Sequence, residues 1–293
     1  MFLVEEYVKA STIQYRDAAD IIEEFAQEMS EMKGKCLDIG CGPGIVTKEL
    51  ILPNLSPEAN LVGMDISKPM IEYAKKMYQD DERLSFQLLD IETMDLPKDT
   101  FDQFNNVLSF YCLHWCQNFR KAFDNIYKLL RPGGKGLFML LSWNDGFDVY
   151  KKLYANPRYR PYMQDTERYI PVFHECKDRR INLRKILENT GFEILHCSER
   201  EKSYIFKNSE IMKSHIIAIN PFISRIPNPL KKEFEDEITR EVVNMKIQFL
   251  NKNENGEQEY NILDRYQIFV TTWTCCSSEK QCKCVEIEKY PEI

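Results

Sequence analysis

The segment from Leu37 to Gly44 reads Leu-Asp-Ile-Gly-Cys-Gly-Pro-Gly, an apolar strand end followed by three glycines at alternate positions. Glycine adopts positive φ and lets other groups approach the backbone, so this spacing is typical of the turn after the first strand of a parallel α/β sheet. Ile45 stands where a dinucleotide-binding loop has its third glycine. Asp38 lies two residues before the first glycine, where a pyrophosphate would be repelled. The turn therefore predicts a cationic ligand, S-adenosylmethionine, rather than NAD.

Composition excludes several other classes of function. The chain has 293 residues, of which 43% are hydrophobic, as is ordinary for a globular protein. Its formal net charge of −7 gives no electrostatic reason to expect nucleic acid or an anionic membrane as a partner. With four histidines we expect no histidine-rich metal site, and we assign no residue as a metal ligand. The N-terminus lacks the basic region of a signal peptide, and no run of 18 apolar residues occurs. We therefore predict a cytoplasmic protein without membrane insertion. We expect it to be a monomer or a homodimer.

The ten cysteines are expected to be free thiols in a reducing compartment. Four of them crowd the end of the chain, at Cys275, Cys276, Cys282 and Cys284. Two interpretations stay open, a metal clip or a flexible, solvated tail. No histidine or second C-x-x-C pair accompanies these cysteines, which favours the tail.

Strand and helix patterns alternate from residue 35 onward and predict a doubly wound α/β sheet of seven strands. The early strands are expected at residues 35–39, 61–65, 84–89, 107–113 and 136–142, and the helices between them at 46–52, 69–78 and 119–130. Later elements are a helix at 183–190, strands at 192–196 and 204–206, a helix at 230–250 and a last strand at 266–273.

These elements divide the chain into five parts. We expect an N-terminal helical cap at 1–34, a core at 35–207, a helical insertion at 208–257, the last core strand at 258–274 and the cysteine-rich tail at 275–293. A helical insertion between two late strands lies over the carboxyl edge of the sheet, where ligands bind, so it is expected to form a substrate lid.

Acidic residues end three successive early strands, at Asp38, Asp65 and Asp90. Asp65 comes 23 residues after Gly42, the distance at which a second-strand acid accepts hydrogen bonds from ribose hydroxyls. Asp38 can hold the methionine ammonium, directly or through water, and Asp90 can accept from the adenine amino group. Apolar residues beside these acids can sandwich the adenine ring: Ile66, Met70 and Ile91.

The glycine turn and the three acids together resemble the class I S-adenosylmethionine-dependent methyltransferases, over roughly residues 35–200 and the last strand. The resemblance implies a Rossmann-like methyltransferase sheet. It places Gly40, Gly42 and Gly44 along the methionine and ribose of the cofactor, and Ser109 near the transferable methyl. A nicotinamide oxidoreductase remains the alternative for this part of the chain.

The fourth strand continues as Ser-Phe-Tyr-Cys-Leu-His-Trp from Ser109 to Trp115, and its Leu-His-Trp resembles methyltransferases that act on small carboxylates. Three segments resemble the insect juvenile hormone acid methyltransferases: 14–18, the Asp90-Ile91 turn with 109–111, and 218–222. The resemblance implies a transferase of juvenile hormone biosynthesis that methylates juvenile hormone acid or farnesoic acid and releases S-adenosylhomocysteine. It makes Gln14 and Trp115 the ligands of the carboxylate.

The chemistry agrees, because a carboxylic acid is already ionised at pH 7 and needs positioning rather than a general base. Gln14 and Trp115 can each donate one hydrogen bond without neutralising the nucleophile. His114 is either a base or a hydrogen-bonded structural histidine. Asn220 either orients the substrate or caps a lid helix. Other acids remain alternatives, namely a fatty acid, a carrier-bound acyl chain or a dicarboxylic acid; the last needs an extra cation such as Arg158, Arg160 or Arg225. A non-catalytic isoprenoid-binding relative is a further alternative.

Overall fold

The computed structural model of the chain describes residues 4–252, 256 and 258–276. The first three residues and most of the cysteine-rich tail, including Cys282 and Cys284, lie outside the described residues, so both interpretations of the tail concern residues that are not described. Within the described ranges, no group of three or more His, Cys, Asp or Glu side chains could hold a metal ion. No helix of these ranges has the length and apolar character to cross a bilayer.

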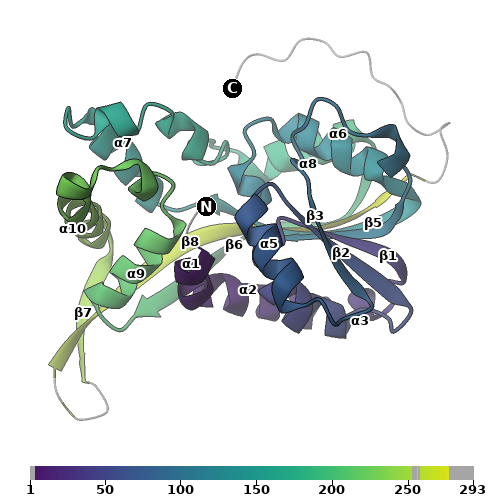
Figure 1. Cartoon of the computed structure of the whole chain (residues 1–293), viewed down its shortest axis with the longest axis horizontal. Helices are drawn as coiled ribbons and strands as arrows, with labels where there is room; N and C mark the ends of the chain where they lie inside the picture. Colours follow the sequence, from purple (N-terminus) through teal and green to yellow (C-terminus); the bar gives the residue numbers. More distant parts are fainter. Residues whose placement is uncertain (1–3, 253–255, 257, 277–293) are drawn as a thin grey trace.

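A mixed sheet forms the centre of the molecule, with strand order β3-β2-β1-β4-β5-β8-β6 (Figure 1). Five strands are parallel: β1 (Gly34–Ile39), β2 (Ala59–Asp65), β3 (Leu84–Leu88), β4 (Phe104–Phe110) and β5 (Leu130–Trp143). The long strand β8 (Gln258–Cys275) is antiparallel to β5 and to β6 (Phe192–Phe206). This confirms the predicted doubly wound, Rossmann-like α/β sheet.

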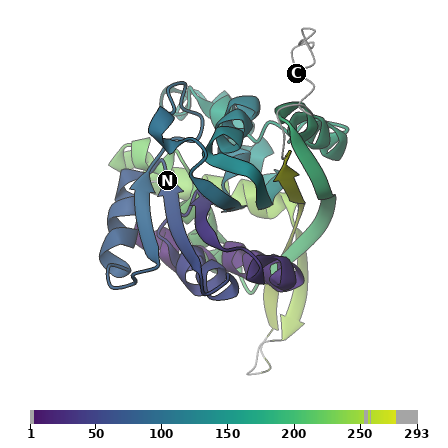
Figure 2. The same ribbon diagram turned by 90° about the vertical axis from the view of Figure 1, so that its right-hand side faces the viewer.

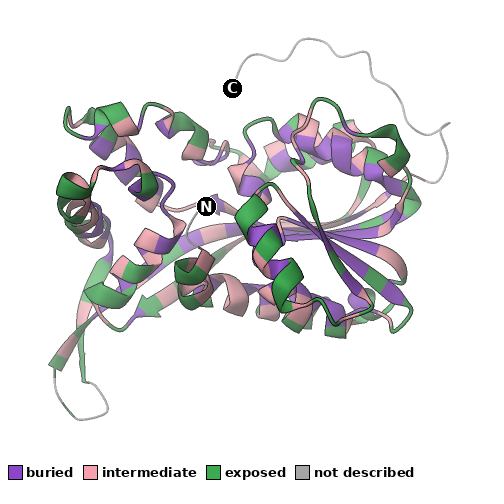
Figure 3. Ribbon diagram, viewed as in Figure 1, coloured by how far each residue is buried: buried purple, intermediate pink, exposed green. Residues whose placement is uncertain are grey.

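Helices cover both faces of the sheet, and two apolar cores fill the layers (Figures 1 and 3). One face packs against α6 (Phe119–Leu129) and α8 (Arg179–Thr190). The other packs against helices on both sides of the glycine turn: α2 (Thr12–Glu24), α3 (Ala26–Ser30), α4 (Leu52–Asn54) and α5 (Lys68–Met77). Beyond the carboxyl edge lie α1 (Val4–Ala10), α7 (Gly146–Ala155), α9 (Ser209–Ile219) and α10 (Asn228–Met245).

Three predicted elements differ from the structure. The helix expected at 230–250 ends at Met245, and the next residues form strand β7 (Ile247–Lys252), which pairs with the outer part of β8 and extends away from the body (Figures 1 and 2). The two strands expected at 192–196 and 204–206 are the single strand β6, because β8 offers it a partner along its whole length. The helix expected at 46–52 contains a π-helical turn, Thr47–Ile51.

Single turns of 3-10 helix complete the connections: 98–100, 113–115, 160–162, 166–169 and 223–225.

Candidate active site

Three glycines shape the turn that follows β1. Gly40, Gly42 and Gly44 have φ angles of 75°, 54° and 85°, in the left-handed region that glycine adopts readily. A Cβ on Gly40 would lie 2.1 Å from Cys112 Sγ, so the turn packs too closely for any side chain there. A Cβ on Gly42 would meet no atom nearer than Tyr7 Cε1, at 3.9 Å. Gly42 therefore leaves a cradle beside the turn that a ligand can enter.

Two of the predicted acids stand beside this cradle. The Gly42 and Ser67 amides donate to the Asp65 carboxylate at 3.0 and 2.7 Å, and the Thr47 hydroxyl donates to Asp38 at 2.6 Å. Burial raises the pKa of Asp38 to about 7 and also raises the pKa of Asp65. No cationic side chain among the described residues pairs with Asp38. A buried carboxylate of this kind favours a ligand that carries positive charge.

The residues expected to bind adenine differ in exposure. Asp90 is exposed, and its carboxylate accepts the Glu92 amide at 2.9 Å. Ile66 is 59% exposed at the end of β2, so its side chain is available for stacking on a ring. Met70 and Ile91 are buried in the apolar cores, where they can only support such a surface from below.

Two adjoining cavities open at this edge of the sheet. We call the first the cofactor cavity; it is lined by the glycine turn, Asp38 and Phe110. We call the second the acid cavity; it lies between β4, β5 and β8 on one side and α9 and α10 on the other. Tyr7, Gln14 and Tyr111 line both cavities. A group bound beside Gln14 is therefore next to a group bound in the cradle.

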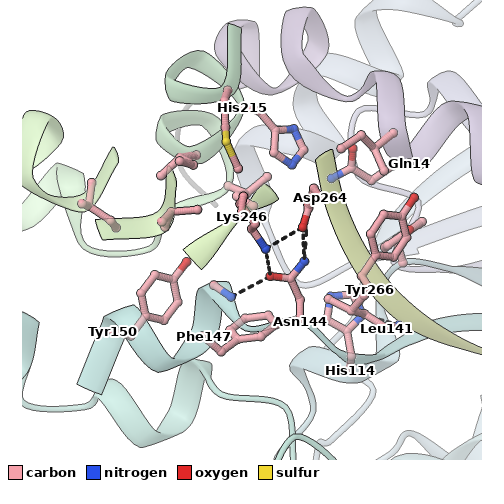
Figure 4. Close-up of a pocket in the computed structure, with 18 of the residues that line it drawn as sticks. Gln14, His114, Leu141, Asn144, Phe147, Tyr150, His215, Lys246, Asp264 and Tyr266 are labelled. Carbon is pink, nitrogen blue, oxygen red and sulfur yellow. Dashed lines mark hydrogen bonds and ion pairs between the residues drawn. The ribbon is translucent and has the colours of Figure 1, made fainter. Parts of the chain in front are cut away.

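Most of the acid cavity is apolar. Its aliphatic lining comes from α2, β5 and the two lid helices: Ile13, Leu141, Met212, Ile216, Ile219, Ile238 and Val242. Trp115 adds an indole that packs edge-on against Phe147, with ring centroids 6.0 Å apart. Gln14 directs its amide nitrogen into the cavity, whereas its amide oxygen is buried without a hydrogen-bond partner (Figure 4).

His114 lines the same cavity and has a defined tautomer. Its Nδ1 accepts the Leu141 amide at 3.5 Å, so in the neutral ring the proton sits on Nε2. Burial lowers the pKa of His114 to about 3, which keeps the ring neutral at physiological pH. The contact of the ring lone pair with the backbone favours the interpretation of His114 as a hydrogen-bonded structural histidine over that of a base.

Comparison with known proteins identifies the family. Residues 37–138 match a family model described as a methyltransferase domain. The chain is 36% identical over 268 residues to a juvenile hormone acid O-methyltransferase of Drosophila melanogaster. The aligned region covers 90% of this chain and 89% of that relative. The chain belongs to the juvenile hormone acid O-methyltransferase family. A second member, from Bombyx mori, is 33% identical over 86% of this chain and 90% of its own length.

A solved structure shares the fold of this chain. A putative methyltransferase from Bacillus halodurans superposes with a TM-score of 0.55 and 17% identity, over 88% of this chain and 99% of that one. At this identity the likeness concerns the fold alone. Membership of the juvenile hormone acid O-methyltransferase family confirms the predicted transferase class and S-adenosylmethionine as its cofactor. The cradle at Gly42 has room for the methionine part of that cofactor, and the buried Asp38 fits its ammonium.

A buried carboxylate fixes the helix that carries Gln14 in this methyltransferase. Asp17 is fully buried, and it accepts hydrogen bonds from the Tyr111 and Tyr266 hydroxyls, both at 2.6 Å, and from the Arg16 guanidinium at 2.8 Å. The network ties α2 to the end of β4 and to the middle of β8. It also holds Tyr111 at a φ of 54°, which a residue with a side chain rarely adopts. Sequence reasoning missed Asp17, because nothing in the local pattern marks it as buried.

A second polar group in the acid cavity was also missed. Lys246 follows α10, Asn144 follows β5, and Asp264 lies in β8, yet the three side chains meet at the cavity wall (Figure 4). Each residue looks like an ordinary surface residue in its own segment. Their separation by up to 120 positions leaves no local spacing that could have found them.

Other predicted site residues lie away from both cavities. The Ser109 hydroxyl donates to the Ile39 carbonyl at 2.9 Å inside the sheet, and its neighbours Phe110 and Tyr111 face the cofactor cavity instead. Asn220 accepts the Phe222 and Ile223 amides at 2.8 and 3.1 Å, which is the capping role, and its side chain also contacts Tyr150, which lines the acid cavity. The arginines considered for a dicarboxylate contact other groups and do not line the acid cavity: Arg158, Arg160 and Arg225.

Proposed function

We propose that this enzyme transfers the methyl group of S-adenosylmethionine to the carboxylate of an isoprenoid acid, juvenile hormone acid or farnesoic acid. The products are the methyl ester and S-adenosylhomocysteine. The observation that carries the proposal is the shared lining of the two cavities by Tyr7, Gln14 and Tyr111. A carboxylate bound at Gln14 is adjacent to the cradle, and the rest of its chain extends into an apolar cavity.

The residues at this junction suit an anionic nucleophile. When bound, the cofactor supplies an activated methyl on a sulfonium. Gln14 Nε2, Trp115 Nε1 and His114 Nε2 are neutral donors that can hold the carboxylate in one orientation without neutralising it. The acid needs no proton transfer, because a carboxylic acid is ionised at neutral pH.

The shape and charge of the acid cavity support a monocarboxylate with an apolar chain. Aliphatic and aromatic side chains make up most of its lining. Among the described residues that line it, Lys246 is the one lysine or arginine, and two carboxylates, Asp145 and Asp264, already pair with its ammonium. A second substrate carboxylate would meet this net negative group. The two relatives also support an isoprenoid monocarboxylate as the substrate, because both are named for juvenile hormone acid.

We further propose a monomer or homodimer that acts in the cytoplasm on the free acid, without nucleic acid and without membrane insertion. The formal charge of −7 supports the absence of polyanionic partners.

The test is methyl ester formation by the full chain with labelled S-adenosylmethionine and farnesoic acid. Trp115→Phe keeps an aromatic ring against Phe147 but removes the N–H donor, and Gln14→Leu removes the amide. Each is expected to lower kcat/KM by roughly 10- to 100-fold, because hydrogen bonds to a charged group contribute about 1.5–3 kcal/mol. For Trp115→Phe the affinity for S-adenosylhomocysteine should stay within twofold, because Trp115 does not line the cofactor cavity.

The matched control is Tyr154→Phe, on the exposed side of α7 and outside both cavities. It should retain the activity of the unmodified enzyme. Full activity of both Trp115→Phe and Gln14→Leu would contradict the assignment of the carboxylate ligands. Absence of any ester, with cofactor binding intact, would contradict the reaction itself.

A further inference from the structure

The three side chains at the wall of the acid cavity form one connected cluster. The ammonium of Lys246 contacts the Asp145 carboxylate, lies 2.6 Å from Asp264 Oδ1 and donates to Asn144 Oδ1 at 3.3 Å. Asn144 Nδ2 in turn lies 3.2 and 3.4 Å from the two Asp264 oxygens (Figure 4). The Lys246 side chain is only 2% exposed. We call Asn144, Lys246 and Asp264 the polar cluster.

The polar cluster lies on a different side of the acid cavity from the cofactor. The residues shared with the cofactor cavity are Tyr7, Gln14 and Tyr111, and none of the cluster is among them. Lys246 instead also lines a third hollow, next to Trp143 and Asp145. A ligand whose carboxylate is held at Gln14 therefore meets the cluster with a more distant part of its chain.

The hydrogen-bonding capacity of the cluster is not exhausted by its internal contacts. The three protons of the Lys246 ammonium are used by Asp145, Asp264 and Asn144. Asp264 Oδ2, however, accepts only the long 3.4 Å contact, and both contacts of the Asn144 NH₂ group go to a single carboxylate. One acceptor and one donor remain for the cavity. A pure hydrocarbon chain would offer neither group a further partner, and incompletely hydrogen-bonded polar groups cost free energy when they are buried.

We infer that the polar cluster recognises a neutral oxygen on the chain of the acid, away from its carboxylate. A hydroxyl group fits best, because it can accept from Asn144 and donate to Asp264. A cyclic ether such as an epoxide can only accept, so it fits less well. A second carboxylate does not fit, because the lysine and its two aspartates carry a net charge of −1. This inference rests on the proposed methylation of an isoprenoid acid and adds a second point of recognition to it.

The cluster also joins the end of α10 to the loop after β5 and to β8, so its loss could loosen the lid without touching specificity. The test must therefore measure selectivity between substrates rather than activity alone. Three fifteen-carbon acids with one skeleton serve this purpose. They are farnesoic acid, its 10,11-epoxide and the alcohol in which water is added across the 10,11 double bond.

The unmodified enzyme should show the highest kcat/KM for the alcohol and the lowest for farnesoic acid, with a ratio of roughly tenfold between them. In Asp264→Asn and in Asn144→Ala this ratio should fall to below about twofold. The control is Asp236→Asn, which removes the ion pair between Asp236 of α10 and Lys213 of α9. This change loosens contacts within the lid but does not touch the cluster, so the ratio should stay near tenfold.

The outcomes separate the inference from the proposed function. If none of the three acids is methylated, the proposed function fails. If all three are methylated with equal kcat/KM by the unmodified enzyme, the reaction stands and the inference is overturned. If the preference persists in both cluster variants, the cluster only anchors the lid, which also overturns the inference.

Discussion

The cofactor cavity and the acid cavity adjoin each other but are built from the chain in opposite ways. The cofactor cavity takes most of its lining from one turn, residues 38–46, and from the end of the neighbouring strand β4, and the N-terminal helices α1 and α2 complete it. The acid cavity takes its lining from residues between Tyr7 and Tyr266, on helices and strands from both ends of the chain. Parallel strands place the first set together automatically, because their carboxyl ends share an edge. Only the folded chain brings the second set together.

This difference predicts how each cavity responds to substitution. The cofactor cavity depends on backbone conformation, so its critical positions are glycines. The acid cavity depends on distant side chains held by buried polar networks, so its critical positions are ionic groups that touch several elements. The following variants compare the two.

The largest effect is expected at the glycine turn. Gly40→Ala should lower the free energy of unfolding by about 3–5 kcal/mol, because a positive φ costs about 1–2 kcal/mol and the new Cβ also collides with Cys112. The matched control is Gly133→Ala, with a φ of 77° but no atom within 4 Å of the added Cβ. Its free energy of unfolding should fall only by about 1–2 kcal/mol, which is what a positive φ costs. Urea denaturation of both variants measures the difference, and equal losses would show that crowding plays no part at the turn.

In the acid cavity the largest effect is expected at Asp17. Asp17→Asn replaces a carboxylate oxygen that accepts from two tyrosines with an NH₂ group, and it removes the ion pairs of Asp17 with Arg16 and Lys202. We expect a loss of about 3 kcal/mol in unfolding free energy, as when buried ion pairs are broken, together with a lower kcat/KM because Gln14 lies one turn away. Asp20→Asn on the same helix is the control: Asp20 is 51% exposed where Asp17 is fully buried. Its change should stay below about 0.5 kcal/mol.

The two cavities also differ in how far they could be predicted from the sequence. Glycine spacing and strand-tip acids located the cofactor cavity, because each signal lies within a few residues of a strand end. The exception is Ser109, whose side chain is turned into the sheet, a direction that a motif does not specify. In the acid cavity only Gln14, His114 and Trp115 were found, and they came from the family resemblance. Asp17 and the polar cluster depend on contacts between distant segments, and β7 depends on a partner strand that follows it.

The smallest effect tests whether the cofactor cavity needs a cation to keep its buried acids ionised. Without ligand the pKa of Asp38 is raised to about 7 by burial, so this carboxyl is largely ionised at pH 8 and largely protonated at pH 6. A cationic ligand favours the ionised form and must displace that proton at low pH. The affinity for S-adenosylhomocysteine, which retains the ammonium, should therefore be constant above pH 8. It should weaken by up to tenfold, about 1.4 kcal/mol, for each unit below pH 7.

Calorimetric titration between pH 5.5 and 8.5 measures this dependence, and Asp38→Asn should flatten it. Asp65 has a raised pKa for the same reason, but the Gly42 and Ser67 amides favour its ionised form. If the slope survives in Asp38→Asn and disappears in Asp65→Asn, the proton is displaced from Asp65. The binding of the cationic end would then depend on the second strand rather than the first. In either case the titrating group is a carboxyl beside the glycine turn, whereas His114 in the acid cavity, with its pKa of about 3, does not titrate in this range.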